Sequence, residues 1–461
     1  MTNAEPSDSG SLFCIFNCMK IFLLFLTICF AFANAQGVQP IKNLGNIPKD
    51  KIQRSFDVSS NSLRKELWLE VEKNEVVKVC IDKKVKEWET KLDSKKLNDS
   101  CLVFQAPSLV GSDTLKVHFS KRPLSRNIYL AIGMKHLKFI RKKVLLGYSP
   151  KPEEGNIAKA LSLAHSKQED PERFALITGT YLVDKYPVTN CEIAHFMNDS
   201  MPVDFSYKHE WIKGVHERWS DVFKERFFYK ECPAHDTAAN SIILLQAMAY
   251  ANMRSFREGL KPYYRFFETN EKGSSIISKG QYIIGYFDFT KRNNQFNFIK
   301  VVADYSSYGY RLPYYDEWMI LARGGDMKNE APWGDSSVAF NDTEKYAKLS
   351  TAKNFKSESV GQLLPNGYGL YDMFGLVWEH VLFEESNPFR VQKNSPSCLK
   401  GGDNGVLKRK DDDKYHTTTY WKELNYGYSQ LNINSDKNAG FRLVRNIGNN
   451  AKWTEVKSDK E

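Results

Sequence analysis

The sequence predicts an α+β protein in which a small all-β domain precedes a larger domain of mixed helices and strands. Short alternating apolar runs recur between residues 55 and 132, a period typical of strands. Beyond residue 133, runs with helical spacing alternate with strand-like runs. A length of 461 residues also exceeds one ordinary core. We therefore expect a β-rich, sandwich-like domain at residues 36–132, a mixed domain at 133–447 and a polar tail at 448–461.

The amino-terminal residues predict a signal peptide at residues 1–35. Met19 and Lys20 are followed by the apolar run IFLLFLTICFAF and then by Ala33-Asn34-Ala35, which is the order of a positive start, an apolar core and a small-residue cleavage site. Glu5 and Asp8 precede this run and carry the wrong charge, so we take Met19 as the true start. Cleavage is expected after Ala35.

This segment predicts an exported bacterial protein that is periplasmic, attached to the cell surface or secreted. A lipoprotein anchor at Cys29 is disfavoured because the bulky Ile28 precedes it. The apolar run is short for a spanning helix, and we expect no membrane span. The charge of +10 comes from 65 basic and 55 acidic residues, which favours a mixed surface. The basic stretches at 135–143 and 408–410 are short or broken, so we expect no nucleic-acid partner.

Removal of the signal peptide leaves five cysteines, an odd number. They are Cys80, Cys101, Cys191, Cys232 and Cys398. In an oxidising compartment Cys80 with Cys101 and Cys191 with Cys232 are compatible pairs, although spacing does not determine connectivity. There is no CxxC pair, and we expect no cysteine–histidine cluster of the kind that binds zinc.

The β-rich region contains five runs that predict strands of an antiparallel sandwich. They lie at residues 67–71, 76–81, 101–106, 114–119 and 127–132. Polar turns separate them, and no catalytic constellation is present. We interpret this region as an adhesion or spacer module.

The mixed region predicts both strands and helices. We expect a strand pair at 139–140 and 144–147, a helix at 157–166, a strand from 174 to 187, a helix from Cys191 that buries Ile193, Phe196 and Met197, a helix at 241–259, a hairpin of 282–289 with 296–302, a helix from Tyr315 to the stop at Gly324-Gly325, and a closing strand at 440–445. The residues after 446 are expected to be frayed.

The stretch NGYGLYDMFGLVWEH at 366–380 predicts a folded loop, because it suits neither an amphipathic helix nor an alternating strand. Its glycines at 367, 369 and 375 allow positive φ or close backbone approach. Asp372 and Glu379 are oxygen donors that suit a hard cation. These residues alone favour a buried structural turn over a metal site.

An ordered set of motifs resembles the formylglycine-generating enzyme family, also called sulfatase-modifying factor domains. The motifs are YPVTN at 186–190, AYAN at 249–252, YRLP with EW at 317–318, ARGG at 322–325, PWG at 332–334, NGYGLYDM at 366–373, VWE at 377–379, KGG at 400–402 and GFRLVR at 440–445. The resemblance covers about 310 residues, from near Gly133 to Asn446. It implies an α+β fold of the C-type-lectin-like kind, preceded here by the β-rich domain.

The resemblance also implies a structural calcium ion at the 366–380 loop. Its expected ligands are the side chains of Asp372 and Glu379 and the backbone oxygens of Gly375 and Val377. Leu376 departs from the family, which usually has asparagine there, so the local hydrogen bonding must differ. The family's second calcium site, expected between Trp333 and Asn366, has no clear match in this sequence.

The family's oxidases hold copper with two cysteines in the segment after the paired glycines. The segment after Gly401-Gly402 contains no cysteine, and hydroxyls or amides are poor ligands for copper(I). Cys398 precedes the glycines and is interpreted as structural or unpaired. We therefore expect no copper and no oxidase chemistry.

The sequence favours a non-catalytic binding or scaffold protein that presents loops to a protein, peptide or glycan. The segment 403–438 is rich in Asn, Asp, Tyr and Lys, and such loops combine adaptable hydrogen bonds with rigid aromatic surface. The expected ligand-binding residues are Asp403, Asn404, Tyr420, Trp421, Tyr426 and Tyr428. A solvated loop cover, an altered protein-modifying oxidoreductase of the formylglycine-generating type and a structural component of a surface or secretion assembly remain as alternatives.

Overall fold

The computed structural model describes twelve stretches of the chain. They are residues 52–120, 125–146, 173–200, 232–240, 242, 244–268, 299–325, 343–348, 358–383, 397–401, 438–448 and 452–455. The predicted signal peptide, the predicted helix at 157–166, the predicted strand at 282–289, the PWG motif and the six expected ligand-binding residues lie outside these stretches.

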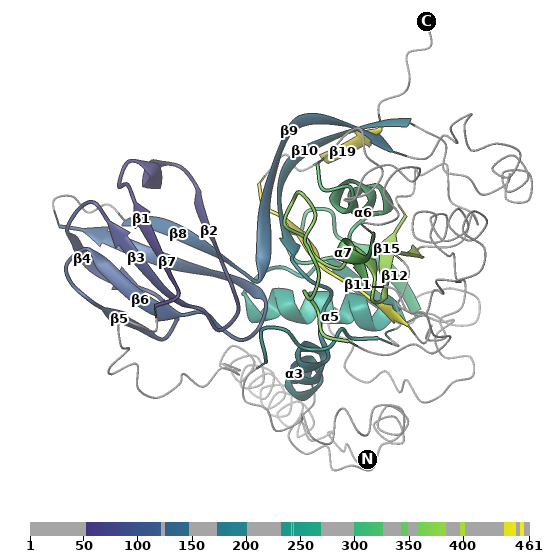
Figure 1. Ribbon diagram of the computed structural model, residues 1–461, viewed down its shortest axis with the longest axis horizontal. Helices are drawn as coiled ribbons and strands as arrows, with labels where there is room; N and C mark the ends of the chain where they lie inside the picture. Colours follow the sequence, from purple (N-terminus) through teal and green to yellow (C-terminus); the bar gives the residue numbers. More distant parts are fainter. Residues whose placement is uncertain are drawn as a thin grey trace, which may run out of the picture. The chain divides into compact units, whose positions relative to one another are not determined.

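Two four-stranded sheets make up the described chain from residue 54 to residue 132 (Figure 1). The first has the order β1-β3-β6-β5 and the second β2-β8-β7-β4. The strands are β1 (Arg54–Val58), β2 (Leu67–Val71), β3 (Val76–Ile81), β4 (Val85–Glu89), β5 (Ser94–Lys96), β6 (Cys101–Gln105), β7 (Gly111–Phe119) and β8 (Ser125–Ile132), with the 3₁₀ helix η3 (Ser62–Arg64) after β1. The five predicted strands are therefore present.

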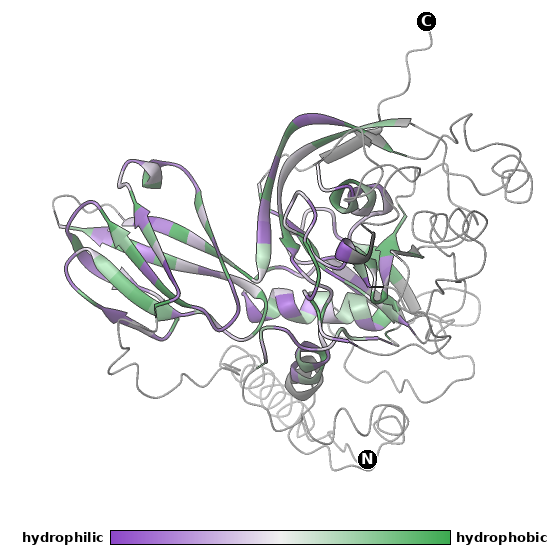
Figure 2. Ribbon diagram, in the orientation of Figure 1, coloured by the Kyte–Doolittle hydropathy of each residue, from purple (hydrophilic) through white to green (hydrophobic). Residues whose placement is uncertain are grey.

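One hydrophobic cluster joins these two sheets, and it takes residues from both. Alternate residues of β3 are buried, including Val77 and Val79, and Leu115 and Val117 of β7 face the same cluster. Figure 2 shows the alternation of apolar and polar positions along these strands. The predicted purely antiparallel pairing is wrong, because β1 pairs with β3 and β2 with β8 in parallel. The Cys80–Cys101 disulfide links β3 to β6.

Two long strands form the centre of the following region. β9 (Met134–Leu146) pairs antiparallel with β10 (Arg173–Asp184), with a register shift between Ile177 and Gly179. The expected strand pair at 139–140 and 144–147 is wrong, because residues 139–140 and 144–146 belong to the single strand β9; residue 147 lies outside the described residues. β10 ends at Asp184, three residues before Pro187.

The opposite faces of β10 bury two different hydrophobic clusters. Leu182 belongs to the cluster that contains α5 (Leu244–Arg257), whereas its neighbours Tyr181 and Val183 belong to the cluster that contains α6 (Tyr315–Ala322). Successive side chains of a strand point to opposite faces, so this strand lies between two cores. Both helices confirm the prediction, and Trp318 of α6 is fully buried.

Short strands bring the remaining described segments together. β11 (Tyr264–Glu268) pairs with β12 (Ile299–Ala303), β13 (Ala347–Lys348) with β14 (Phe374–Gly375), and β15 (Trp378–Leu382) with both β16 (Ser397–Lys400) and β17 (Ala439–Gly440). The helices α3 (Asn190–Ser200) and α7 (Thr343–Tyr346) complete this part. The expected partner of β12 at 282–289 lies outside the described residues.

The carboxyl-terminal strands differ from the prediction. The expected strand at 440–445 is divided, since Phe441 to Leu443 separate β17 from β18 (Val444–Asn446). The tail was expected to be frayed, but β19 (Lys452–Glu455) pairs antiparallel with β10. β10 thus contacts β9 along one edge and β18 and β19 along the other.

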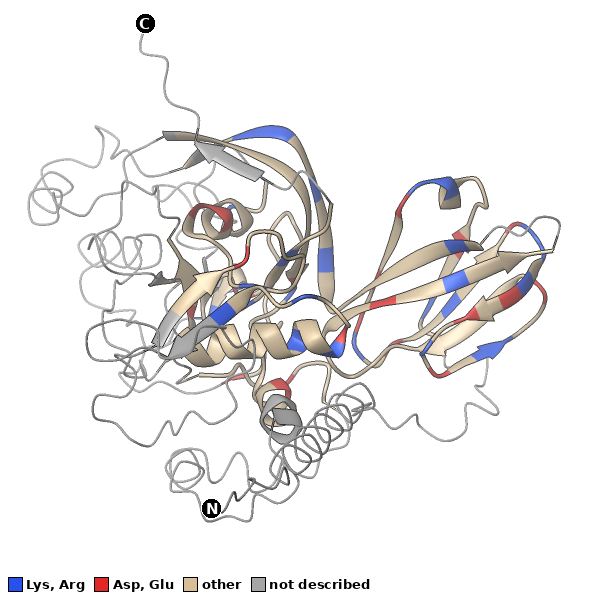
Figure 3. Ribbon diagram, turned by 180° about the vertical axis from the view of Figure 1, so that it is seen from behind, with Lys and Arg blue, Asp and Glu red and all other residues tan. Residues whose placement is uncertain are grey.

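Polar contacts connect the two-sheet region with later segments. Arg257 donates to the Val110 carbonyl at 2.6 Å, and Ser112 donates its hydroxyl to Glu258 at 2.6 Å. Figure 3 shows basic and acidic positions interspersed along the described elements. Within the described stretches, no helix combines the length and the apolar character needed to cross a membrane.

Candidate functional site

The loop at 366–380 is anchored to the end of α6 by one amide. Asn366 donates to the carbonyls of Leu321 and Ala322 at 2.7 and 3.2 Å, and its oxygen accepts the amide hydrogens of Tyr368 and Leu370. Carbonyls at a helix end lack partners within the helix. This side chain therefore closes the helix and folds the loop against it.

Two glycines of the loop are required by its geometry. A Cβ at Gly367 would lie 2.2 Å from the Gly324 carbonyl oxygen, and Gly375 combines φ of +75° with a Cβ position 2.3 Å from the Lys348 carbonyl oxygen. Residues other than glycine rarely adopt a positive φ. The predicted need for glycine at these positions is confirmed.

Arg442 lies at the centre of the site and is fully buried. Its Nη2 donates to Glu379 at 2.7 Å and to the carbonyls of Tyr371 and Asp372 at 2.9 and 3.2 Å. Its Nε lies 2.8 and 2.9 Å from the two Glu379 oxygens. The guanidinium therefore neutralises the Glu379 carboxylate and binds the loop's backbone at the same time.

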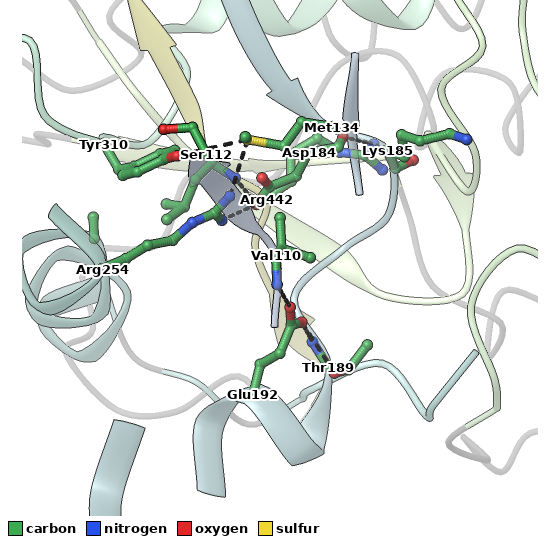
Figure 4. Close-up of polar contacts among 12 residues, drawn as sticks. Val110, Ser112, Met134, Asp184, Lys185, Thr189, Glu192, Arg254, Tyr310 and Arg442 are labelled. Atoms are coloured by element: carbon green, nitrogen blue, oxygen red, sulfur yellow. Dashed lines mark hydrogen bonds and ion pairs between the residues drawn. The ribbon is translucent and has the colours of Figure 1, made fainter. Parts of the chain in front are cut away.

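The same arginine reaches the end of β10. Arg442 donates to the Asp184 carbonyl at 3.3 Å, and the Asp184 side chain accepts hydrogen bonds from Arg254 Nη1 at 2.9 Å and from the Leu443 amide at 3.0 Å. Figure 4 shows Asp184 beside both arginines. Two buried ion pairs are thus joined through one residue. This arrangement fixes β10, α5 and the 366–380 loop to one another.

Asp372 is the least compensated acid of the loop. Burial raises its pKa to about 6, although a hydrogen bond from the Gly361 amide at 2.6 Å and the nearby Arg442 oppose this shift. Its backbone φ is +54°, an angle that Asn and Asp adopt more readily than most residues. The charged form of Asp372 is therefore costly in the folded protein.

His380 follows Glu379 in β15 and is a buried neutral imidazole. Burial lowers its pKa to about 4, and its Nε2 lies 2.7 Å from the Ile242 carbonyl oxygen, to which it donates. A nitrogen that donates to a backbone carbonyl is not available as a proton acceptor. The geometry gives His380 a structural role.

The four expected calcium positions differ in how far their oxygens are engaged. Glu379 receives Arg442 on both oxygens, and Trp318 Nε1 also donates to it at 2.7 Å. The Gly375 carbonyl accepts the Val377 amide at 2.8 Å. One carboxylate oxygen of Asp372 accepts a hydrogen bond from the Gly361 amide, and the other has no hydrogen bond among the residues described. The oxygen-only donor set suits calcium, and Asp372 fits this role better than Glu379.

The packing of Leu376 explains why this loop accepts leucine at a position where asparagine was expected. Its φ is +65°, and its side chain is buried with Tyr186, Ala238, Val360 and Val377. Leucine at positive φ costs about 1–2 kcal/mol, which is comparable with the gain from burying such a side chain. Apolar packing of the Leu376 side chain therefore offsets the cost of its backbone angle.

The cysteines were predicted in part. Both compatible pairs, Cys80–Cys101 and Cys191–Cys232, are disulfides. Sequence reasoning did not anticipate that potential ligand atoms of Cys191, His195 and Cys232 lie within 4.8 Å of one another, with the two sulfurs joined in a disulfide. The spacing of Cys191 and His195 by four residues on a predicted helix was the available signal. Cys232 has no such signal, since 41 residues separate it from Cys191.

Sequence reasoning also missed the role of Arg442. Its motif, GFRLVR, was recognised, but no periodicity connects residue 442 with Glu379, which is 63 positions earlier. An unpaired acidic residue in an apolar loop was the only hint that a buried cation should approach it. Arg254 of α5, which pairs with Asp184 at the end of β10, was missed for the same reason.

A comparison with protein families matches most of the chain. The family described as sulfatase-modifying factor enzyme 1-like domain matches residues 153–447. The chain is 31% identical over 205 residues to "Chaperone protein LppX" of Paenibacillus barcinonensis, covering 40% of this chain and 65% of that protein. It is also 31% identical over 114 residues to the formylglycine-generating enzyme of Mus musculus, covering 20% and 30%. The matches thus span less than two thirds of either relative.

A solved structure gives a further likeness. "Treponema denticola variable protein 1" aligns with 73% of this chain and 99% of its own, at 16% identity and a TM-score of 0.44.

Proposed function

Because this chain belongs to the sulfatase-modifying factor enzyme 1-like domain family, we propose that it is a non-catalytic member that uses the family's C-type-lectin-like scaffold to present binding loops. The β-rich domain at 36–132 precedes this scaffold. The protein acts after export, and its two disulfides are compatible with an oxidising compartment. Its ligand is a protein, peptide or glycan.

The distribution of cysteines carries this proposal. No cysteine follows Cys398 in the sequence, and the four cysteines between residues 52 and 240 are paired as disulfides. A copper(I) site of the family's kind needs two thiolates in the segment after the paired glycines. Two buried ion pairs join Arg254 with Asp184 and Arg442 with Glu379. Charged residues that neutralise each other in this way suit a supporting role.

A protein ligand is favoured over a glycan. One relative carries the name of a chaperone protein, and a chaperone binds polypeptides. The aromatic and amide-rich segment at 403–438 supplies the residue types that protein-binding loops use. We therefore assign binding to Asp403, Asn404, Tyr420, Trp421, Tyr426 and Tyr428.

Crosslinking in the producing cell tests the proposal. We expect one defined protein partner to be captured by the parent, and capture to fall at least tenfold in the variant Tyr420→Ala/Trp421→Ala, because aromatic anchors dominate interface energy. Tyr305→Ala is the matched control, since Tyr305 is a tyrosine that is 71% exposed outside this segment. Equal capture by all three proteins contradicts the assignment.

The enzymatic alternative is tested in parallel. The purified protein is incubated with a sulfatase-type cysteine peptide, copper and a reductant, and the peptide is analysed by mass spectrometry. We expect no conversion of cysteine to formylglycine. Conversion would identify the protein as an oxidoreductase with an altered site.

We further propose that the 366–380 loop binds one calcium ion through the Asp372 carboxylate and the backbone oxygens of Gly375 and Val377, with Glu379 as its nearby acid. The cost of the buried Asp372 charge supports this proposal. The positive charge of the ion would compensate Asp372, because Arg442 already compensates Glu379. Asp372 is therefore the side chain on which calcium dependence should rest.

Asp372→Asn is expected to make stability less dependent on pH. The pKa of Asp372 rises from 3.8 to about 6 on folding, so its contribution to stability is greatest below pH 4 and is lost as the pH rises through 6. In EDTA at pH 8, the free energy of unfolding of the variant should exceed that of the parent by up to about 3 kcal/mol. Near pH 4 the two values should be equal. Chemical denaturation across this range measures the difference.

Adding calcium at pH 8 should stabilise the parent and leave Asp372→Asn unchanged. Asp113→Asn serves as the control, because burial also raises the pKa of Asp113 but this residue lies in β7. A parent whose unfolding midpoint is identical in calcium and in EDTA would contradict the calcium site, while the pH result would still test Asp372.

A further inference from the structure

Three side chains with metal-ligating atoms meet at the beginning of α3. Cys191 and His195 belong to α3, and Cys232 belongs to the segment at 232–240. Their ligand atoms lie within 4.8 Å of one another, and the two sulfurs form a disulfide. The proposed binding function does not use this cluster.

The backbone on the α3 side of the cluster is fixed by contacts that do not involve sulfur. The Cys191 amide donates to Asp236 Oδ2 at 2.8 Å. Glu192 Oε2 accepts the amide of Thr189 at 2.9 Å, and its other oxygen lies 3.3 Å from the Val110 nitrogen (Figure 4). None of these bonds involves a sulfur atom, so opening the disulfide breaks none of them directly.

The backbone at Cys232 is also held by a hydrogen bond that does not involve sulfur. Asn74 Nδ2 donates to the Cys232 carbonyl at 2.8 Å. Cys191 and His195 are four residues apart, so their side chains lie one turn apart on the same face of the helix. The three ligands thus converge from two backbone segments, each of which has its own anchoring hydrogen bond.

The surroundings favour metal binding by the reduced cysteines. Cys191 lies in the first turn of α3, where the helix dipole stabilises a thiolate. The two cysteines are 3% and 1% exposed and cluster with Leu109, whereas His195 is half-buried. Two thiolates, one imidazole and one open position form a donor set known for Zn²⁺.

We propose that opening of the Cys191–Cys232 disulfide creates a Zn²⁺ site with Cys191, Cys232 and His195 as ligands. An external dithiol supplies two electrons and two protons, becomes a disulfide itself and leaves two thiols. Zn²⁺ then displaces both thiol protons. At a Zn–S distance of about 2.3 Å, the two sulfurs lie about 3.8 Å apart, so they move apart by side-chain rotation when the disulfide opens. Disulfide and metal exclude each other, so the site is occupied only in the reduced protein.

Metal analysis of the full-length protein tests this proposal. The protein is reduced with a dithiol, freed of reductant without oxygen, and titrated with zinc chloride or with cadmium chloride as a spectroscopic probe. We expect one more bound ion per chain after reduction than before, together with cadmium–thiolate absorption. The dithiol also opens the Cys80–Cys101 disulfide, so reduced Cys80→Ala/Cys101→Ala protein corrects for binding at those two thiols.

Matched variants assign the ligands. Cys191→Ala/Cys232→Ala should lose the additional ion, and His195→Ala should weaken its binding at least tenfold. Cys80→Ala/Cys101→Ala removes the other disulfide, and His118→Ala removes a histidine outside the cluster; both should retain the ion. Zinc should also protect Cys191 and Cys232 from alkylation by iodoacetamide, as located by mass spectrometry.

Two outcomes would overturn the proposal. One is an equal metal content before and after reduction in folded protein. The other applies if reduction unfolds the chain: a zinc site coupled to folding should then restore the native circular dichroism, and failure of zinc both to bind and to restore the spectrum excludes it.

Discussion

Replacing Arg442 by methionine is expected to lower the free energy of unfolding by about 3–5 kcal/mol. Methionine keeps much of the side chain's length but removes the charge that faces Glu379, which is 1% exposed. It also leaves the carbonyls of Tyr371 and Asp372 without the Nη2 donor. An unpaired buried carboxylate is far more costly than the loss of the pair's own attraction. Chemical denaturation with a two-state fit measures the change.

A double variant separates the unpaired charge from the lost packing. Arg442→Met/Glu379→Met should be more stable than Arg442→Met alone, because it removes both charges. Lys116→Met is the surface control, since Lys116 pairs with Glu89 at 2.9 Å but both side chains are largely exposed; little change is expected there. If Arg442→Met costs no more than Lys116→Met, Arg442 does not hold the loop.

Gly375→Ala is expected to cost about 2–5 kcal/mol, from a positive φ and from overlap with the backbone. Its Cβ would lie 2.3 Å from the Lys348 carbonyl oxygen, which belongs to the paired strand β13. Backbone atoms cannot rotate away as the end of a side chain can. The lost stability should appear as a lower unfolding midpoint with the same denaturant slope.

Gly259→Ala isolates the conformational part of that cost. Gly259 has φ of +71°, close to the +75° of Gly375, but nothing lies within 4 Å of its Cβ position. We expect about 1–2 kcal/mol there. Equal losses at the two glycines would show that the loop shifts to accept a side chain, contrary to the close packing described above.

Local pattern predicted the elements well because each depends on neighbours in sequence. The alternation in VVKVCI gave β3, and the spacing of Leu245, Met248 and Ala249 gave α5. The bounds of β10 were less accurate, because Asp184 ends the strand through contacts with Arg254 and the Leu443 amide. Those partners lie 70 and 259 residues away.

Pairing and charge compensation were beyond local pattern. The parallel pairs of β1 with β3 and of β2 with β8 depend on how the chain crosses between two sheets. Likewise, the carboxylates of the loop were recognised from the sequence, but the contact of Arg442 with Glu379 was not. A side chain can reach a buried site from any distance in sequence, so spacing contains no trace of it.

The position of Arg442 late in the chain has a consequence for the order of synthesis. Its hydrogen bond to the Asp184 carbonyl spans 258 residues, and its bonds to Glu379 span 63. A ribosome produces the acid and the strand end long before the arginine that completes them. Until then, burying Glu379 would leave its carboxylate without the charge of Arg442, which is costly. The contacts around Glu379 can therefore form only after residue 442 has been synthesised, so this region cannot complete its packing step by step as the chain emerges.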